Sequence, residues 1–272
     1  MKINDKYILE EFVKTSDRKF IYAAYPIYKK LYYGNSEFQE IVIAETPFGK
    51  TLFLDDALQL TEYDEEIYHK ALVLPGIKKS YRDILILGGG DGGAAREVKK
   101  FNPNARVKIV DIDRMVTEVI KKYMPEVPQG VFEMDGVELI NDDAFHYVEV
   151  DNSKYDYIIS DLTDIREEWE RGSQVNRLYT SEFLNTLKSR LREDGKIVYH
   201  IDLYPNFKHM INKFLAEACK VFKYITVYGV YIPSFCGIWT YALLSNRPFR
   251  IKHIKTPYQD KLYIITERSY RI

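Results

Sequence analysis

The chain has 272 residues, 46% of them hydrophobic, and its formal net charge at pH 7 is -1. This length allows one large α/β domain with a small appendage, and the near-zero charge argues against nucleic acid or a membrane surface as a partner. Two cysteines without a C-x-x-C pair, an acidic N-terminus and the lack of an apolar run of about 18 residues predict a cytoplasmic protein.

The first 62 residues predict a small β domain. Tyrosine-rich runs through residue 35 alternate weakly between polar and apolar side chains, which is typical of short antiparallel strands. Residues 40–46 and 51–54 predict two more strands, joined by a turn at Pro47–Gly49. The spacing then becomes helical, with Ile67, Ala71 and Leu74 on one side. We therefore predict two domains, 1–62 and 63–272.

Residues 81–245 alternate between strand and helix patterns, an order that favours a doubly wound sheet. Apolar runs predict strands near 84–87, 107–111, 137–141, 155–161, 197–202, 223–230 and 238–244. Helical spacing predicts helices near 93–100, 114–122, 181–193 and 207–220. Residues 246–272 show no informative pattern.

The first βαβ unit of this region predicts a nucleoside site. Gly88, Gly90 and Gly93 fit G-x-G-x-x-G directly after a strand, and the next strand ends at Asp111. Glycines let the backbone approach a ligand, and an acid at the second strand accepts from ribose hydroxyls. A plain glycine turn between strand and helix is the alternative, and the spaced Asp111 disfavours it.

Asp91 lies in the middle of this loop and narrows the choice of ligand. A dinucleotide would place its pyrophosphate at the helix N-terminus, where the carboxylate would repel it. A ligand that carries a cation at this point fits better. S-adenosylmethionine and its decarboxylated relative both carry an ammonium there.

Acidic side chains lie at the carboxyl end of each of the predicted parallel strands. Ligands bind beyond these strand ends, so we expect the acids to surround one opening. A single such aspartate is more often a helix cap, but the set predicts a strongly negative potential. No histidine or cysteine accompanies them at metal-ligand spacing, so we expect a polycationic substrate and no metal. The acids are Asp91, Asp111, Asp142, Asp143, Asp161, Asp164 and Asp202.

The chain resembles the polyamine aminopropyltransferases, the family of spermidine and spermine synthases. The resemblance runs from about Tyr28 to Ser245 and includes YKKLYYGNSEFQ, FGKTLFLDDALQL, YDEEIYHKAL, ILILGGGDGGAAREV, NDDAF, YDYIISDLTD and IPSFCGIW. Generic methyltransferases lack its GGGDGG loop, its D-E-x-x-Y-H segment and its I-P-S-x-x-x-x-W segment. It implies an α/β fold: a seven-stranded Rossmann-like methyltransferase sheet with a small N-terminal β domain, assembled as a homodimer or homotetramer.

The resemblance implies decarboxylated S-adenosylmethionine as co-substrate, with no other cofactor, and a small-molecule polyamine as acceptor. The donor-binding residues that it implies are Gln39, His69, Gly88, Gly90, Asp91, Asp111, Asp142, Asp143 and Asp164. Among these, Gln39 contacts the nucleoside, Asp111 the ribose and Asp143 the adenine amino group. Asp91 and Asp164 hold the ammonium of the aminopropyl chain. A hydrogen-bonded histidine between domains is the alternative for His69.

Asp161 matches the catalytic aspartate of the family, and Tyr68 matches the tyrosine that assists it. A neutral amine attacks the methylene beside the sulfonium in line, Asp161 takes or relays its proton, and methylthioadenosine leaves. The acceptor-binding residues implied are Tyr68, Asp161, Asp164, Asp202 and Phe235. His200 stands at a usual glutamine position without an assigned role, and Trp239 is interpreted as core.

Two departures from the family leave the acceptor open among putrescine, agmatine, cadaverine and spermidine. Ile165 replaces a proline, and segment 166–171 is an insertion in the loop that covers the acceptor. Phe235 replaces a tyrosine, so a hydroxyl that could meet an amine is missing. We expect acceptors beyond putrescine. The alternatives are a small-molecule methyltransferase that uses S-adenosylmethionine, and an inactive binding module, which the pair Asp161 and Asp164 disfavours.

Overall fold

The computed structural model describes residues 6–14, 20–163 and 175–269. Asp164 and segment 166–171, for which the sequence carries predictions, lie outside these ranges. Among the described residues, no helix combines the length and the apolar character that crossing a membrane requires.

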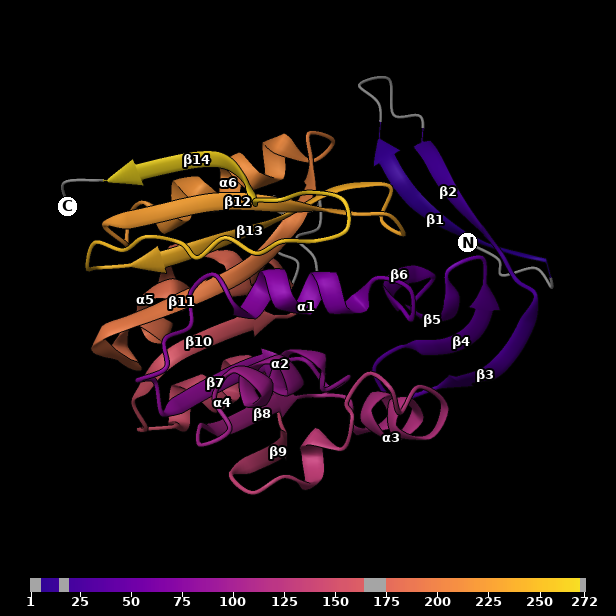
Figure 1. Cartoon of the computed structure of the whole chain (residues 1–272), viewed down its shortest axis with the longest axis horizontal. Helices are drawn as coiled ribbons and strands as arrows, with labels where there is room; N and C mark the ends of the chain where they lie inside the picture. Colours follow the sequence, from indigo (N-terminus) through magenta and orange to yellow (C-terminus); the bar gives the residue numbers. More distant parts are fainter. Residues whose placement is uncertain (1–5, 15–19, 164–174, 270–272) are drawn as a thin grey trace.

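A large mixed sheet forms the body of the molecule, with strand order β14-β12-β13-β11-β10-β7-β8-β9 (Figure 1). Its central and β9-side strands run parallel: β11 (Leu191–Tyr204), β10 (Tyr155–Asp161), β7 (Asp83–Gly88), β8 (Arg106–Asp111) and β9 (Val137–Asn141). The remaining strands pair antiparallel: β13 (Gly237–Ser245), β12 (Tyr224–Ile232) and β14 (Tyr263–Ser269). The carboxyl ends of the parallel strands therefore share one edge.

The sheet has eight strands rather than the seven predicted. The additional strand is β14, in the stretch that showed no informative pattern. An edge strand hydrogen-bonds on one side only, here to β12, so it needs less apolar character than a central strand. The other seven strands overlap their predicted ranges, although β11 begins at Leu191 rather than near residue 197. The central strands are the easiest to recognise, because a strand buried on both faces must be apolar throughout.

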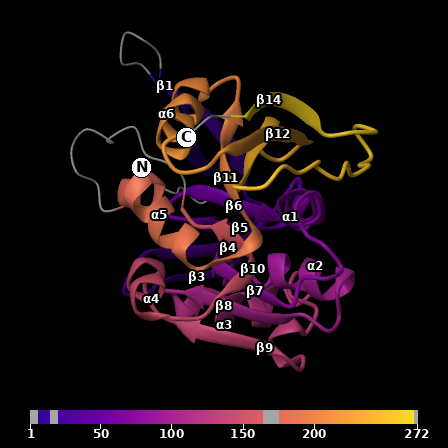
Figure 2. The same ribbon diagram turned by 90° about the vertical axis from the view of Figure 1, so that its left-hand side faces the viewer.

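Helices cover both faces of the sheet, as Figure 2 shows. Helices α1 (Glu65–Val73) and α2 (Gly93–Phe101) pack on one face, where Ile84 and Ile86 of β7 contribute to the same core. Helices α4 (Ala144–Val150), α5 (Ser181–Ser189) and α6 (Lys208–Ala218) pack on the other, with Leu85 and Leu87. Short 3-10 helices span Val131–Glu133 and Val175–Tyr179.

Two helix predictions need correction. Helix α4 was not predicted, because its single amphipathic stretch between two aspartates is too short to show a clear period. The helix predicted over 181–193 ends at Ser189, and Leu191 already pairs with Tyr155 as the start of β11. Pairing with β10 is a tertiary interaction, so local helical spacing could not show where the helix stops.

The N-terminal region forms a four-stranded sheet, with strands β3 (Lys29–Asn35), β4 (Glu40–Thr46), β5 (Gly49–Leu54) and β6 (Ala57–Thr61), and a hairpin of β1 (Tyr7–Lys14) and β2 (Phe20–Pro26). Ile41 and Ile43 pack against helix α3 (Arg114–Tyr123), which follows β8. Val42 and Ala44 pack on the opposite face, against the hairpin. Helix α3 therefore attaches the small sheet beside the carboxyl end of β8 (Figure 1).

Candidate active site

The glycine-rich turn after β7 lies where three strand ends meet. Gly88 has a φ of 76°, and a Cβ there would lie 2.0 Å from the Asp161 carbonyl oxygen. A Cβ on Gly90 would lie 2.7 Å from Asp111 Oδ2. Gly88 therefore requires glycine, because a side chain there would meet the backbone at the end of β10, whereas a side chain at Gly90 would displace the Asp111 carboxylate. The turn is packed against β8 and β10 through its own backbone.

Asp111 accepts two backbone hydrogen bonds in this turn. The Gly90 N–H donates to Oδ2 at 2.8 Å, and the Asp113 N–H donates to Oδ1 at 2.9 Å. Burial raises the pKa of Asp111 to about 6, against the lowering effect of these N–H groups and with the help of the Asp91 charge. The carboxylate is thus held rigidly at the end of β8, directly beside the glycine turn.

Gln39 reaches the same place from the small sheet. Its Nε2 donates to Asp113 Oδ2 at 2.8 Å, and the Ser36 hydroxyl donates to the same oxygen at 2.6 Å. Asp113 also caps helix α3 by accepting from the Met115 N–H. Sequence reasoning missed Asp113, although an aspartate directly before a helix is a recognisable N-cap. It connects the small sheet to the turn that carries Asp111.

Neighbouring residues of helix α1 contact two different aspartates. Tyr68 donates its hydroxyl to Asp161 Oδ1 at 2.6 Å, and His69 Nε2 lies 3.3 Å from Asp91 Oδ1. Asp161 Oδ2 is buried and has no hydrogen-bond partner among the described residues. Burial raises the pKa of Asp161, and the Asp91 charge adds to the rise. The site therefore holds a buried carboxyl group with one unpartnered oxygen and an unusual affinity for a proton.

Ligand atoms of His69, Asp91 and Asp161 lie within 4.8 Å of one another, a spacing that a metal ion would allow. The chemistry of the set does not fit one. The other imidazole nitrogen, Nδ1, lies 2.7 Å from Glu65 Oε2, so both nitrogens face carboxylate oxygens. An imidazole that donates on both sides has no lone pair left for a metal.

Three further predicted acids that the structure describes lie at the same edge but are engaged in different ways. Asp143 caps helix α4 through Oδ1, and its Oδ2 lies 3.2 Å from Arg177. Asp142 pairs with His146, one helical turn later. Asp202 is 6% exposed within β11 and accepts from the Leu203 N–H at 2.6 Å. The helix-cap alternative considered for a single aspartate therefore applies to Asp143.

Aromatic rings line one side of the Tyr68–Asp161 pair. The Phe235 ring stands perpendicular to that of Tyr68, with 6.1 Å between the ring centroids, and its centroid lies 4.7 Å from that of Trp239. His200 stacks on Trp239 at 6.0 Å, and its Nε2 contacts the Leu162 carbonyl oxygen. In the described part of the chain, the buried Trp239 Nε1 has no hydrogen-bond partner. Trp239 thus packs against the core, as interpreted from the sequence, and also borders the site.

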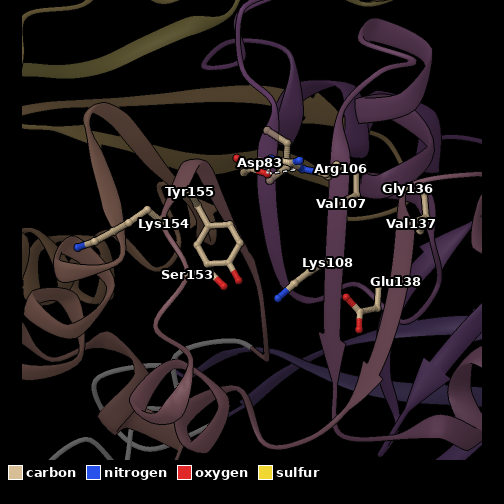
Figure 3. A pocket seen from close by; sticks show the side chains of 11 residues that line it. Asp83, Arg106, Val107, Lys108, Gly136, Val137, Glu138, Ser153, Lys154 and Tyr155 are labelled. Carbon is tan, nitrogen blue, oxygen red and sulfur yellow. Dashed lines mark hydrogen bonds and ion pairs between the residues drawn. The ribbon is translucent and has the colours of Figure 1, made fainter.

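A separate pocket of about 240 Å³ lies at the opposite edge of the sheet, where β7, β8, β9 and β10 begin (Figure 3). Figure 3 shows Lys108, Glu138 and Tyr155 around it, with the Asp83–Arg106 ion pair at one end. None of the site residues predicted from the sequence lines this pocket. Ligand sites of open α/β sheets lie at the carboxyl edge, so this pocket is not the candidate site.

Two family models and several known proteins match most of the chain. The model of the spermine/spermidine synthase domain matches residues 60–253, and that of the spermidine synthase tetramerisation domain matches residues 12–62. A polyamine aminopropyltransferase of Hyperthermus butylicus is 38% identical over 232 residues, which cover 83% of this chain and 78% of that relative. A polyamine aminopropyltransferase of Aquifex aeolicus is 34% identical over 258 residues, which cover 90% of this chain and 87% of that relative.

Solved structures are similar over most of their length. Spermidine synthase from Thermotoga maritima matches with a TM-score of 0.78 and 26% identity, covering 89% of this chain and 79% of that one. A spermidine synthase in complex with the transition-state analogue AdoDATO matches with a TM-score of 0.79 and 25% identity, covering 91% and 82%. The protein is thus a transferase of the aminopropyl-transferring class. The chain belongs to the spermine/spermidine synthase family, and the tetramerisation match supports an oligomer.

Proposed function

We propose that this enzyme transfers the aminopropyl group of decarboxylated S-adenosylmethionine to an amine, releases methylthioadenosine, and uses acceptors besides putrescine. The observation that carries the proposal is the Tyr68–Asp161 hydrogen bond of 2.6 Å beside the partly buried Asp91. This arrangement places a candidate base, Asp161, next to a second carboxylate, Asp91. The donor is also consistent with the relative that was solved with a transition-state analogue.

The donor would lie along the carboxyl edge of the sheet. In this proposal its adenine meets Asp142 and Asp143, and its ribose meets Asp111 near Gln39, where Gly88 and Gly90 leave room for the backbone to approach. The ammonium of the aminopropyl arm meets Asp91, together with Asp164 from beyond the described residues. The carboxylate of intact S-adenosylmethionine would be repelled and poorly solvated among these acids.

The acceptor amine must lose a proton before it can attack, since amines are protonated at neutral pH. Asp161 is suited to take that proton, because its raised pKa lies closer to the working pH than that of an ordinary aspartate. Tyr68 donates to Oδ1, and Oδ2, which has no partner among residues 6–14, 20–163 and 175–269, is left for the amine. The remaining gain in rate comes from holding two cations in line.

The acceptor end is the part where this chain differs from its family. Phe235 presents a ring where relatives carry a hydroxyl, and Trp239 packs on it at 4.7 Å. Asp202 supplies a negative group deeper in β11. A short diamine needs polar partners for both ammonium groups, since an unmet buried charge is costly. A longer cation can extend past the apolar ring, which favours agmatine, cadaverine or spermidine alongside putrescine.

One panel of assays tests donor and acceptor together. The enzyme is incubated with S-adenosylmethionine or its decarboxylated relative and each of the four amines, and the nucleoside product is identified. We expect methylthioadenosine from the decarboxylated donor only, with kcat/KM for one of the other amines at least equal to that for putrescine. Adenosylhomocysteine as the product would identify a methyltransferase instead. A preference for putrescine above about a hundredfold, roughly 2.7 kcal/mol in transition-state binding, would contradict the broad acceptor range.

The insertion 166–171 offers a second arm of the same assay. The family carries this loop over the acceptor, so we expect its deletion to change the ranking of the amines while donor binding stays unchanged. The oligomer is proposed to be a homodimer or homotetramer. Light scattering on the eluting peak of a size-exclusion column distinguishes these two states from a monomer.

A further inference from the structure

His69 lies between two carboxylates in the interior of the protein. Its side chain is 1% exposed, with Nδ1 at 2.7 Å from Glu65 Oε2 and Nε2 at 3.3 Å from Asp91 Oδ1. An ionised carboxylate can only accept hydrogen bonds, so each nitrogen must carry a proton to satisfy both neighbours. The geometry therefore selects the imidazolium form of His69.

Arg96 fixes the carboxylate on one side of His69. Its guanidinium, 2% exposed, meets Glu65 with both terminal nitrogens, Nη1 to Oε1 at 2.8 Å and Nη2 to Oε2 at 2.9 Å. Nη1 also donates to the Val127 carbonyl oxygen at 2.6 Å, and Nε donates to Glu97 Oε1 at 3.0 Å. A two-pronged contact of this kind fixes orientation as well as charge. It joins helix α2 to helix α1 beneath the site.

Asp91 ends this chain of charges inside the glycine turn. Its Oδ1 accepts from the Gly93 N–H at 2.6 Å and faces His69. Burial works against its charge, yet the nearby imidazolium holds the pKa of Asp91 below its ordinary value. Burial would also lower the pKa of His69, but Asp91 and Glu65 outweigh it and raise the pKa of His69 to about 10.

We propose that Glu65 and Arg96 are positioning residues that act through His69. Their ion pair keeps His69 doubly protonated, and this imidazolium keeps the Asp91 carboxylate ionised and fixed at the place where the ammonium of the donor binds. The inference deepens the proposed function and rests on it for the identity of the ammonium. In the sequence, Glu65 and Arg96 stand within motifs of the family resemblance, but no role was predicted for either.

The arrangement gives two adjacent carboxyl groups opposite tasks. Asp91 contacts the imidazolium and stays ionised, while Asp161 contacts Tyr68 and takes up protons more readily than an ordinary aspartate. His69 is the group that distinguishes them, since it faces Asp91 directly. Pairs of titratable groups with pKa values pushed apart are the usual basis of acid and base roles within one site.

The test compares two buried carboxylates that share Arg96. Glu65→Gln removes the one that touches His69, and Glu97→Gln is the matched control, because Glu97 pairs with Arg96 but does not carry the His69 contact. The chain has five histidines, so NMR of histidine-labelled enzyme resolves them, with His69→Gln to identify the signal. We expect His69 to stay protonated through pH 9 in wild type and in Glu97→Gln, and to titrate below pH 8, at least about two units lower, in Glu65→Gln.

Kinetics supply the second measurement. At pH 8 we expect Glu65→Gln to raise the KM for decarboxylated S-adenosylmethionine about tenfold or more, because Asp91 is then no longer held as a fixed carboxylate for the donor ammonium. We expect kcat to stay within about threefold of wild type, because Tyr68 and Asp161 are unchanged. The defect should shrink at pH 6.5, where His69 is protonated again. A merely structural role would not depend on pH in this way.

Several results would overturn the inference. They are a wild-type His69 that titrates near its ordinary pKa, equal shifts in Glu65→Gln and Glu97→Gln, or a KM ratio that does not change with pH. The wild-type titration decides the matter even where Glu65→Gln fails to fold, and it needs no turnover. Absence of aminopropyl transfer by wild type overturns the proposed function instead, so the two failures are distinguishable.

Discussion

Individual side chains at the carboxyl edge combine properties that exposed residues do not have. Asp161 has a buried oxygen, Oδ2, without a hydrogen-bond partner in the described part of the chain, and burial raises the pKa of this carboxyl group because water cannot stabilise its charge. The neighbouring Asp91 is equally near the interior but has a lowered pKa, because His69 lies beside it. Burial is the main cause of the raised pKa of Asp161, and His69 is the main cause of the lowered pKa of Asp91, so substitutions test the two carboxyl groups separately.

Replacing Asp161 with asparagine should abolish most turnover and spare donor binding. The amide keeps the shape but cannot take a proton, and loss of a general base costs about a hundred- to ten-thousandfold in kcat. Asp156→Asn, at the other end of β10, is the control and should retain wild-type kcat. Stopped assays give kcat, and calorimetry gives the donor Kd. An Asp161→Asn enzyme with wild-type turnover at neutral pH would remove Asp161 from the role of base.

At the scale of elements, backbone groups and buried charges hold the site in place. Helix α1 contributes Tyr68 and His69, and helix α3 anchors the small sheet that carries Gln39. Lys99 of α2 is 7% exposed, and its Nζ donates to the carbonyl oxygens of Pro103, Ala105 and Asp135. These contacts tie α2 to the segments on either side of β8. The glycine turn therefore begins a helix whose far end is also fixed.

We expect Lys99→Met to lower the free energy of unfolding by about 3 kcal/mol, because three carbonyl oxygens lose their shared donor. Lys100→Met is the matched control. Lys100 is 45% exposed and pairs only loosely with Glu97 at 3.6 Å, so its loss should cost less than about 1 kcal/mol. Urea denaturation followed by circular dichroism measures both. Equal costs for the two variants would show that the Lys99 contacts do not stabilise the fold.

At the scale of the whole molecule, two buried cations make stability depend on pH in opposite directions. His69 has a pKa of about 10 in the folded state, above its ordinary 6.5. The stability that His69 contributes to the fold is therefore complete below pH 6.5 and is lost as pH rises toward 10. Burial lowers the pKa of Lys196 to about 8, from 10.5. The unfolded chain binds that proton more tightly, so the corresponding stability is gained as pH rises from 8 to 10.5.

The free energy of unfolding should consequently fall by about 2 kcal/mol between pH 6.5 and 8, where only His69, and not Lys196, makes stability depend on pH. Above pH 8 the two effects oppose each other, so the curve should level off. In Lys196→Met the decline should continue toward pH 10, since the opposing group is gone. Urea titrations at constant ionic strength give both curves. A wild-type curve that stays flat between pH 6.5 and 8 would mean that folding does not raise the pKa of His69.

Local sequence determined the order of the elements and the glycine turn. The apolar runs of the central strands are readable because both faces of a parallel sheet are buried, and G-x-G-x-x-G followed by Asp111 is a local pattern. The family resemblance pointed to Tyr68 and Asp161, which lie 2.6 Å apart in the structure. Their roles in the reaction stay predictions.

Only the tertiary structure decided which residues meet across the chain. Strand β14 exists because β12 offers it hydrogen bonds, and helix α5 ends early because Leu191 pairs with Tyr155. The contact of Arg96 with Glu65 joins two helices, and no periodicity records it. A buried charge is stable only beside its partner, and the partner is chosen by packing in three dimensions rather than by neighbours in sequence.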